Sequence, residues 1–445
     1  MKFSEWKAYW KKIDWTRKWF AVFVLIRPLV DNFYFIKEYS SFLSPLYIVG
    51  VLTPFFCIAS MQTKKLGPKI PQSADEFMRV WGITIAINCI VLLVYQFSID
   101  NFGDSIKYFT PILMFFYLRR FIQSKEDLHF ILQTFLYSCI FPFGMLAFEV
   151  FVHPIDPHHV SEGRGGGTRL RGSYGDSMSY AVYFIGALLI YSYFYLDKMF
   201  DPIRKERPPT WKLLAVFGVC VGGIISIRHV STWSVFLAIF ALLMWFNAKN
   251  MRGAGAFIFL GLFVLPFFAQ SIYQTQIYPL IAKEFNVING DTDIQYGMDG
   301  RISRWERYFE IWDKMPSFTH IFGVSFSHFK ETTAMIGGGM HNDFIRLLFL
   351  TGYFGVVIYL VFLFLVFFRK KYFRPQERYL IMSAFIATFL YSISTLPTLY
   401  LAFMNYTFPI FCFALLPRKK AYGIVTTTSP VIQQTNRQPL PAAPA

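Results

Sequence analysis

The chain has 445 residues, of which 55% are hydrophobic and 16% charged, whereas soluble globular domains carry about 25% charged residues. Its 53 Phe and 26 Tyr exceed what one soluble core would bury, so the composition excludes an ordinary soluble domain and predicts a membrane protein. The net charge of +16 is then attributed to membrane topology and to attraction for anionic membrane lipids, and no nucleic-acid partner is expected.

Apolar stretches of the length that crosses a bilayer recur along the chain and predict an all-α, polytopic fold with about twelve transmembrane helices. The predicted spans are 19–36, 42–60, 79–98, 105–121, 128–152, 176–196, 211–227, 230–246, 253–273, 344–368, 379–397 and 398–416. Residues 1–18 are charged and aromatic, and no small-residue cleavage site follows the first apolar run, so no cleaved signal peptide is expected.

Lys and Arg in the connections predict the orientation. With both termini in the cytoplasm, every inside connection is basic. Residues 1–418 are then one transmembrane domain with two long outward loops, 153–175 and a large one at 274–343 between helices 9 and 10. The Pro-, Thr- and Gln-rich segment 419–445 is expected to be a disordered cytoplasmic tail.

Arginines on the predicted outward face run against this bias and need a local reason. Arg171, Arg228 and Arg301 together would suit a diphosphate, because guanidinium groups bind phosphate oxygens in pairs and stay charged. The alternative for each arginine is contact with lipid headgroups or a nearby carboxylate.

Residues 300–312 have the pattern of an amphipathic helix, with Ile302, Trp305, Phe309 and Trp312 at helical spacing. Arg301, Arg304 and Arg307 fall elsewhere around the helix. Such a helix could lie on the outer membrane surface, or pack against the protein's own spans.

His341 is the sharpest catalytic candidate, because it follows three glycines and precedes an apolar span. A neutral imidazole can accept a hydroxyl proton near neutral pH. A positive helix end and nearby arginines would lower its pKa and favour that form. The alternative is that His341 or Asn342 merely caps the helix.

Other polar and sulfur-bearing residues carry weaker signals. The loop histidines His153, His158 and His159 have no regular ligand spacing, so no metal site is expected. Arg27 and Asp31, four residues apart in the first span, are expected to pair with each other. The cysteines lie inside apolar stretches and are expected to be small core residues; they are Cys57, Cys89, Cys139, Cys220 and Cys412.

Four segments in chain order resemble the O-antigen ligase/polymerase superfamily. They are RLRGSYGDSMSYA, SIRHVSTWS, GRISRWERYFEIW with FGVSFSHF, and HNDFIRLLFLTGYFG, within roughly residues 165–365. The large loop between spans 9 and 10 also resembles that family's layout. One departure is Ile227-Arg228-His229, where family members usually have Ser before the arginine and Gly after it.

The resemblance implies a metal-independent, cofactor-free inverting glycosyltransferase of the bacterial inner membrane with a periplasmic active site. Its donor would be an undecaprenyl-diphosphate-linked glycan, and its acceptor a hydroxyl of lipid A core or of a growing glycan chain. A polysaccharide chain-length regulator is a further implied partner. By resemblance, His341 is the essential histidine, and Arg228 and Arg301, with Arg171, bind the diphosphate. Asn342, Arg304 and Trp305 would support them.

Two alternatives stay open. Ligation to a lipid core and polymerisation of repeat units use the same donor and chemistry, so these residues do not separate them. A flippase or transporter for the same lipid-linked glycan would also have many spans. It is less favoured, because the candidate residues sit at one surface and charges at the midplane are few.

Overall fold

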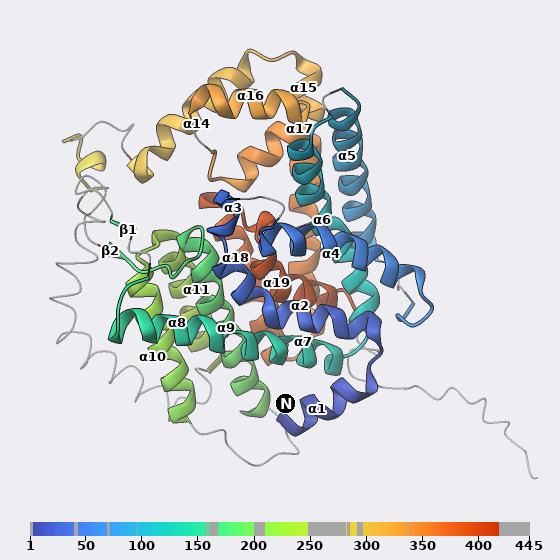
Figure 1. Cartoon of the computed structure of the whole chain (residues 1–445), viewed down its shortest axis with the longest axis vertical. Coiled ribbons are helices and arrows are strands. Elements are labelled where there is room, and N and C mark those ends of the chain that lie inside the picture. The colour runs from blue at the N-terminus through green and yellow to red at the C-terminus, as the bar shows by residue number, and fades with distance from the viewer. Residues whose placement is uncertain are drawn as a thin grey trace, which may run out of the picture.

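The computed structural model is built almost entirely of helices (Figure 1). It describes residues 3–39, 43–68, 72–95, 97–155, 158–159, 168–199, 210–247, 282, 285–291, 297–337 and 339–417. The helices are α1 (Phe3–Lys12), α2 (Trp15–Asn32), α3 (Ile36–Tyr39), α4 (Pro45–Gln62), α5 (Ser73–Tyr95), α6 (Ile99–Phe121), α7 (Lys125–Ser138), α8 (Ile140–Phe151), α9 (Ser177–Met199), α10 (Thr210–Ile227), α11 (Val230–Asn247), α14 (Gly297–Asp313), α15 (Ser317–Phe322), α16 (Phe326–Ile336), α17 (Asp343–Phe368), α18 (Pro375–Ser394) and α19 (Leu401–Ala414), with short 3-10 turns at Arg369–Tyr372 and Pro397–Leu399. Two-residue strands β1 (His158–His159) and β2 (Thr168–Arg169) pair antiparallel.

Six of the described helical stretches are long and apolar enough to cross a membrane. They are Pro45–Gln62, Ser73–Val94, Lys125–Phe151, Ser177–Met199, Thr210–Ile227 and Asp343–Tyr372. Ser231–Asn247 and Leu401–Ala414 are apolar but shorter. The predicted span 253–273 and the predicted tail 419–445 lie outside the described residues. The architecture of the described residues is consistent with a helical membrane protein. The count of about twelve spans stays a prediction.

The fifth predicted span is helical but interrupted. Instead of one helix over 128–152, α7 ends at Ser138 and α8 begins at Ile140. Pro142 explains the break, because proline has no N–H and its ring crowds the carbonyl four residues earlier, that of Ser138.

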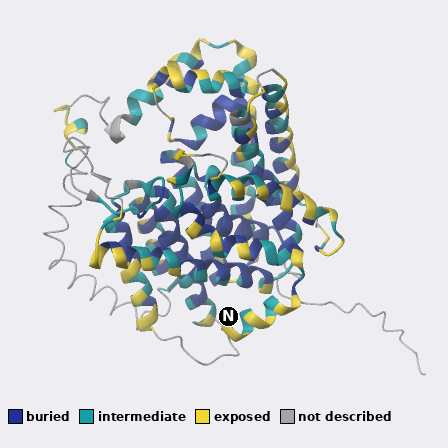
Figure 2. Cartoon of the chain, in the orientation of Figure 1, coloured by how far each residue is buried: buried dark blue, intermediate teal, exposed yellow. Residues whose placement is uncertain are grey.

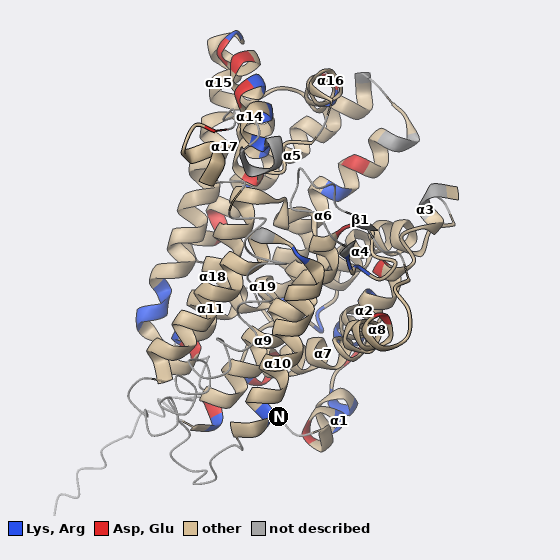
Figure 3. Ribbon diagram, turned by 90° about the vertical axis from the view of Figure 1, so that its left-hand side faces the viewer, with Lys and Arg blue, Asp and Glu red and all other residues tan. Residues whose placement is uncertain are grey.

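Burial differs sharply between helices (Figure 2). Helices α9 and α19 are buried along most of their length, whereas α4 exposes large apolar side chains such as Leu52 and Phe55. Long stretches of the central helices carry no charge, while α14 shows both signs (Figure 3). Apolar side chains on an outer helix surface are what a lipid environment requires. The five cysteines are buried and free, as expected for core residues.

Helices α14, α15 and α16 form a layer at one end of the molecule, opposite α1 (Figure 1). An ion pair anchors α16 to the start of α6, with Lys330 Nζ 2.6 Å from Asp104 Oδ2. Lys330 also donates to Asn101 Oδ1 at 2.6 Å. The Phe326 and Tyr108 rings stack nearby at 4.6 Å. This layer is therefore fixed against the bundle through both charge and aromatic packing.

Helix α17 is broken at Gly352, whose φ of 64° and ψ of −172° are not helical. The interruption removes helical partners from nearby carbonyls, and other segments replace them. Phe349 O accepts from Val324 N at 2.7 Å, and Leu350 O accepts from Asn88 Nδ2 at 3.0 Å. The break thus lets the α15–α16 connection and α5 dock onto the same turn of α17.

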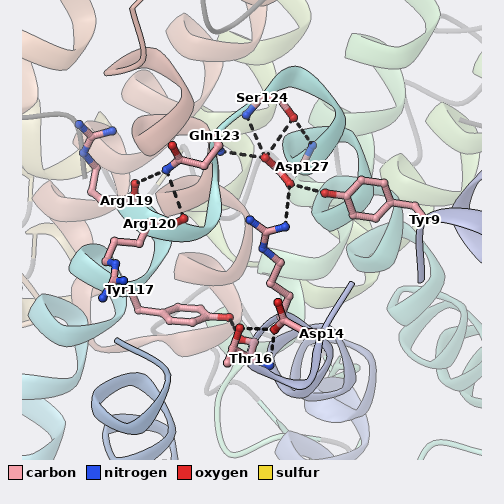
Figure 4. A network of polar contacts seen from close by, with 10 residues as sticks. Tyr9, Asp14, Thr16, Tyr117, Arg119, Arg120, Gln123, Ser124 and Asp127 are labelled. Atoms are coloured by element: carbon pink, nitrogen blue, oxygen red, sulfur yellow. Dashed lines mark hydrogen bonds and ion pairs between the residues drawn. The ribbon is translucent and has the colours of Figure 1, made fainter. Parts of the chain in front are cut away.

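A polar network ties α1, α2, α6 and α7 together (Figure 4). Asp127 completes a capping box with Ser124 and accepts the hydroxyl of Tyr9. Tyr117 Oη donates to Thr16 O at 2.6 Å. Since the Tyr9–Asp127 and Tyr117–Thr16 bonds join segments far apart in the chain, this network fixes how the N-terminal helices pack.

Candidate functional site

Asn342, and not His341, caps helix α17. Its Oδ1 accepts from Ile345 N at 3.0 Å, which satisfies one of the open N–H groups of the first turn. Its Nδ2 donates to Ile393 O at 2.9 Å, and the side chain is buried. Asn342 therefore fills the capping role, and the imidazole of His341 takes no part in the cap.

The cap makes a stability prediction. Asn342→Ala should lower the free energy of unfolding by about 2–3 kcal/mol, from the lost cap and from the stranded Ile393 carbonyl. Asn342→Ser keeps a capping oxygen without placing a carboxylate against the Ile393 carbonyl, and should lose only the second part. Thermal unfolding in detergent would measure both, with Ser325→Ala, which removes the α16 cap, as the matched control. Equal losses for Asn342→Ala and Ser325→Ala would contradict the double role.

His341 lies between the α14–α16 layer and the start of α17 and remains exposed to solvent. Partial desolvation lowers its pKa below the usual value, and the positive charges of Arg301 and Arg304 lower it further. Asp176 opposes this shift. The neutral imidazole that can accept a proton is therefore the favoured form near neutral pH.

Helix α14 brings Arg301 and Trp305 to this place. Arg301 Nη1 donates to Ser394 O at 2.8 Å, at the end of α18. Trp305 Nε1 donates to Met340 O at 2.7 Å, directly before His341. The predicted helix 300–312 is confirmed as part of α14, and these two bonds fix its rotation beside the histidine.

The buried face of α14 coincides only in part with the predicted apolar face. Phe309 is 41% exposed, whereas Tyr308 is fully buried and Trp312 nearly so. Both pack with Phe349 of α17, at ring distances of 5.4 and 5.0 Å. Packing against α17 therefore buries Tyr308 and Trp312, and leaves Phe309 on the exposed part of the helix surface. In the structure α14 packs against the protein's own helices, the alternative to a surface-lying helix.

Arg171 and Arg228 come from segments that are bonded to each other. Leu170 N donates to Ser226 O at 3.0 Å, which joins the loop after β2 to the end of α10. Arg228 terminates α10 in the left-handed conformation, with φ 51°. Glycine is the usual residue at such a position, so the arginine is retained there at a cost of about 1–2 kcal/mol. The departure at Ile227-Arg228-His229 thus falls on an unusual turn.

Backbone strain coincides with the predicted site. Among the described residues other than glycine, those with positive φ are Arg228, at 51°, and His341, at 46°. Such conformations are uncommon for non-glycine residues and concentrate at functional sites. Both residues were singled out from sequence for their chemistry, and the backbone geometry is an independent observation.

The sequence reasoning missed Asp176. Its Oδ1 accepts from Ser179 N at 2.7 Å in the first turn of α9, and its Oδ2 accepts the Tyr400 hydroxyl at 2.7 Å. Its charge also acts on His341. An aspartate directly before the apolar run that begins at Ser177 is a recognisable capping signal, so the position, though not its proximity to His341, was accessible from sequence.

A buried ion pair fixes the helix that follows His341. Arg346 Nη2 lies 2.6 Å from Asp343 Oδ1, and Thr398 Oγ1 donates to Asp343 Oδ2 at 2.7 Å. This pins the start of α17 to the connection between α18 and α19. The loop histidine His153 is exposed, and the described residues contain no group of three or more potential metal ligands.

No protein-family model matches this chain, and no curated protein matches it. The class that the structure supports is a multi-pass helical membrane protein. Its candidate site gathers His341, Arg301 and Arg304 where α14 meets the start of α17.

Proposed function

We propose that this protein is a membrane glycan transferase of the O-antigen ligase/polymerase type, acting at the periplasmic face of a bacterial inner membrane. It moves a glycan from undecaprenyl diphosphate to an acceptor hydroxyl, on a lipid A core or on a growing polysaccharide. The observation that carries the proposal is His341, released from capping, held in a strained conformation, and flanked by the charges of Arg301 and Arg304.

The order of the four motifs along the chain supports the same assignment. They place an arginine before α9, one at the end of α10, one at the start of α14, and a histidine at the start of α17. A diphosphate leaving group needs several fixed cations, because its negative charge increases as its bond to the sugar breaks. Arginine suits that role, since its planar fork matches phosphate oxygens and stays charged.

The reaction follows from these roles. His341 takes the proton from the acceptor hydroxyl, whose oxygen attacks the anomeric carbon of the donor sugar. The new carbon–oxygen bond forms as the bond from that carbon to the diphosphate oxygen breaks, with inversion. Arg228, Arg301 and Arg171 stabilise the undecaprenyl diphosphate that leaves. Neither a metal nor a cofactor is needed in this scheme.

A reconstituted assay tests the proposal. Proteoliposomes holding the full chain would receive an undecaprenyl-diphosphate glycan and candidate acceptors, and both transfer and translocation of the lipid would be followed. Transfer is the expected result, and the acceptor used distinguishes ligation from polymerisation. Translocation of the lipid without transfer would replace the proposal with a flippase.

The proposal also predicts a pH effect. Because partial burial and the two arginines lower the pKa of His341, transfer should persist into mildly acidic pH and fall only once that imidazole is protonated. Arg304→Gln removes one positive charge, so the pKa rises and the acid limb of the kcat/KM profile moves to higher pH. Arg307→Gln is the control, since Arg307 is exposed on the same helix and is not among the charges that shift His341. An acid limb that Arg304→Gln leaves in place would argue against His341 as the base.

A further inference from the structure

A cavity of about 220 Å³ lies between helices α2, α4 and α6 and the starts of α9 and α19. It has room for about seven water molecules, or for part of a larger ligand. In the predicted topology all five wall segments are outward ends of spans. Asp176, whose charge acts on His341, also lines the wall, so the cavity adjoins the candidate site.

Arg27 lines this cavity and carries hydrogen-bond donors that no protein group uses. Its Nη2 pairs with Asp31 Oδ1 at 2.7 Å, as the sequence predicted. Its Nε and Nη1 are buried and have no hydrogen-bond partner, and the residue is only 7% exposed. A buried donor without a partner costs about 1–3 kcal/mol, and more when it is charged. A ligand that drew the guanidinium toward the cavity and accepted from these nitrogens would remove that cost.

The charges around the cavity indicate the kind of ligand. Arg27 and Lys107 are balanced by Asp31 and Asp176 in the same wall, so a phosphate would face two carboxylates. Each carboxylate can accept more bonds than it does now, since an ionised carboxylate has about four acceptor positions. Donors and acceptors in one wall match hydroxyl groups, each of which both donates and accepts.

Aromatic side chains complete the match. Tyr34, Tyr47 and Tyr400 also line the wall, and they combine an apolar ring with a polar hydroxyl. The remaining wall is largely aliphatic, from residues such as Val51 and Met404. A sugar ring has this same division, with hydroxyls around its edge and C–H groups on its faces.

We propose that this cavity is a binding subsite for one neutral sugar ring, held by Arg27 and Asp31 through its hydroxyls. The subsite deepens the proposed function and rests on it for its role: the ring is the terminal sugar of the acceptor or a sugar of the donor glycan. Binding itself does not require that any transfer takes place, so the two proposals are separable.

The chain offers a steric test that leaves the ion pair in place. Gly50 of α4 lines the cavity, and a Cβ there meets no heavy atom within 4 Å. A side chain can therefore start from Gly50 without a clash at its Cβ, and Gly50→Leu should occupy part of the cavity. Gly218→Leu is the matched control, because Gly218 is also an open helical glycine but is not part of the cavity wall.

Saturation-transfer NMR on the full chain in nanodiscs would measure binding of glucose, galactose, N-acetylglucosamine and N-acetylgalactosamine. At least one sugar should give a signal that is lost in Gly50→Leu, because the new side chain occupies the pocket, and that persists in Gly218→Leu. The double change Arg27→Gln with Asp31→Asn should abolish it as well. No signal from any sugar, or a signal that survives both changes, would overturn the proposal. Displacement of the sugar by inorganic phosphate would replace it with an anion site.

The transfer assay separates the two sources of the sugar. If the ring belongs to the acceptor, Gly50→Leu raises the KM for acceptor and leaves that for donor unchanged. If the ring belongs to the donor, Gly50→Leu raises the KM for donor and leaves that for acceptor unchanged. Sugar binding by a wild-type protein that performs no transfer would retain the subsite and remove the proposed reaction.

Discussion

Replacing His341 with asparagine is expected to lower the rate of glycan transfer by about 10²- to 10⁴-fold, the usual contribution of a general base. Asparagine keeps a hydrogen-bonding side chain but does not accept a proton at neutral pH. It also tolerates the left-handed conformation that residue 341 adopts, with φ 46°. The loss should therefore appear in kcat while the protein folds normally.

Stability measurements separate catalysis from structure at this position. The free energies of unfolding of His341→Asn and His341→Gly should both lie within about 1 kcal/mol of the wild-type value, because glycine and asparagine accept positive φ. His341→Ala should be less stable than either, since its Cβ is strained there. If His341→Asn retained full transfer, or if His341→Gly unfolded, the histidine would be a structural residue and the proposed mechanism would fail.

Hydropathy predicted the helical membrane architecture well, because a bilayer demands long apolar runs whatever the tertiary contacts. It did not predict where helices break. The break between Ser138 and Ile140 depends on Pro142, a local signal that was overlooked. The break at Gly352 depends on the backbone of α15 lying against it, and no local pattern encodes that contact.

The candidate site was predictable in its chemistry but less so in its geometry. Sequence left both His341 and Asn342 as candidates for the cap, and the bond from Asn342 to Ile393 depends on a neighbour 51 residues away. It also grouped Phe309 with the apolar face of the helix over 300–312, whereas packing buries Tyr308. The cavity at Arg27 draws on five separate segments, so spacing along the chain could not reveal it.

The contact at Gly352 leads to the largest expected loss of stability. A Cβ there would lie 2.2 Å from Ile321 O, and a Cβ at Gly323 would lie 2.5 Å from the carbonyl carbon of Leu350. The two backbones thus approach each other at glycines from both sides. The φ and ψ of Gly352, 64° and −172°, also belong to a region that essentially only glycine occupies.

Gly352→Ala should therefore lower the free energy of unfolding by about 3 kcal/mol or more, from backbone strain together with the clash. Since α15 and α16 dock at this turn of α17, the change should also displace the layer that holds Arg301 beside His341, and transfer should fall with stability. Thermal unfolding in detergent would measure the first effect, and the proteoliposome assay the second. Gly222→Ala is the matched control: a Cβ at Gly222 in α10 meets nothing within 4 Å, and alanine is favoured over glycine in a helix by about 1 kcal/mol. If Gly352→Ala melted at the temperature of Gly222→Ala, the two backbones could not be in contact, and the docking of the α14–α16 layer onto α17 would have to rest on its side chains alone.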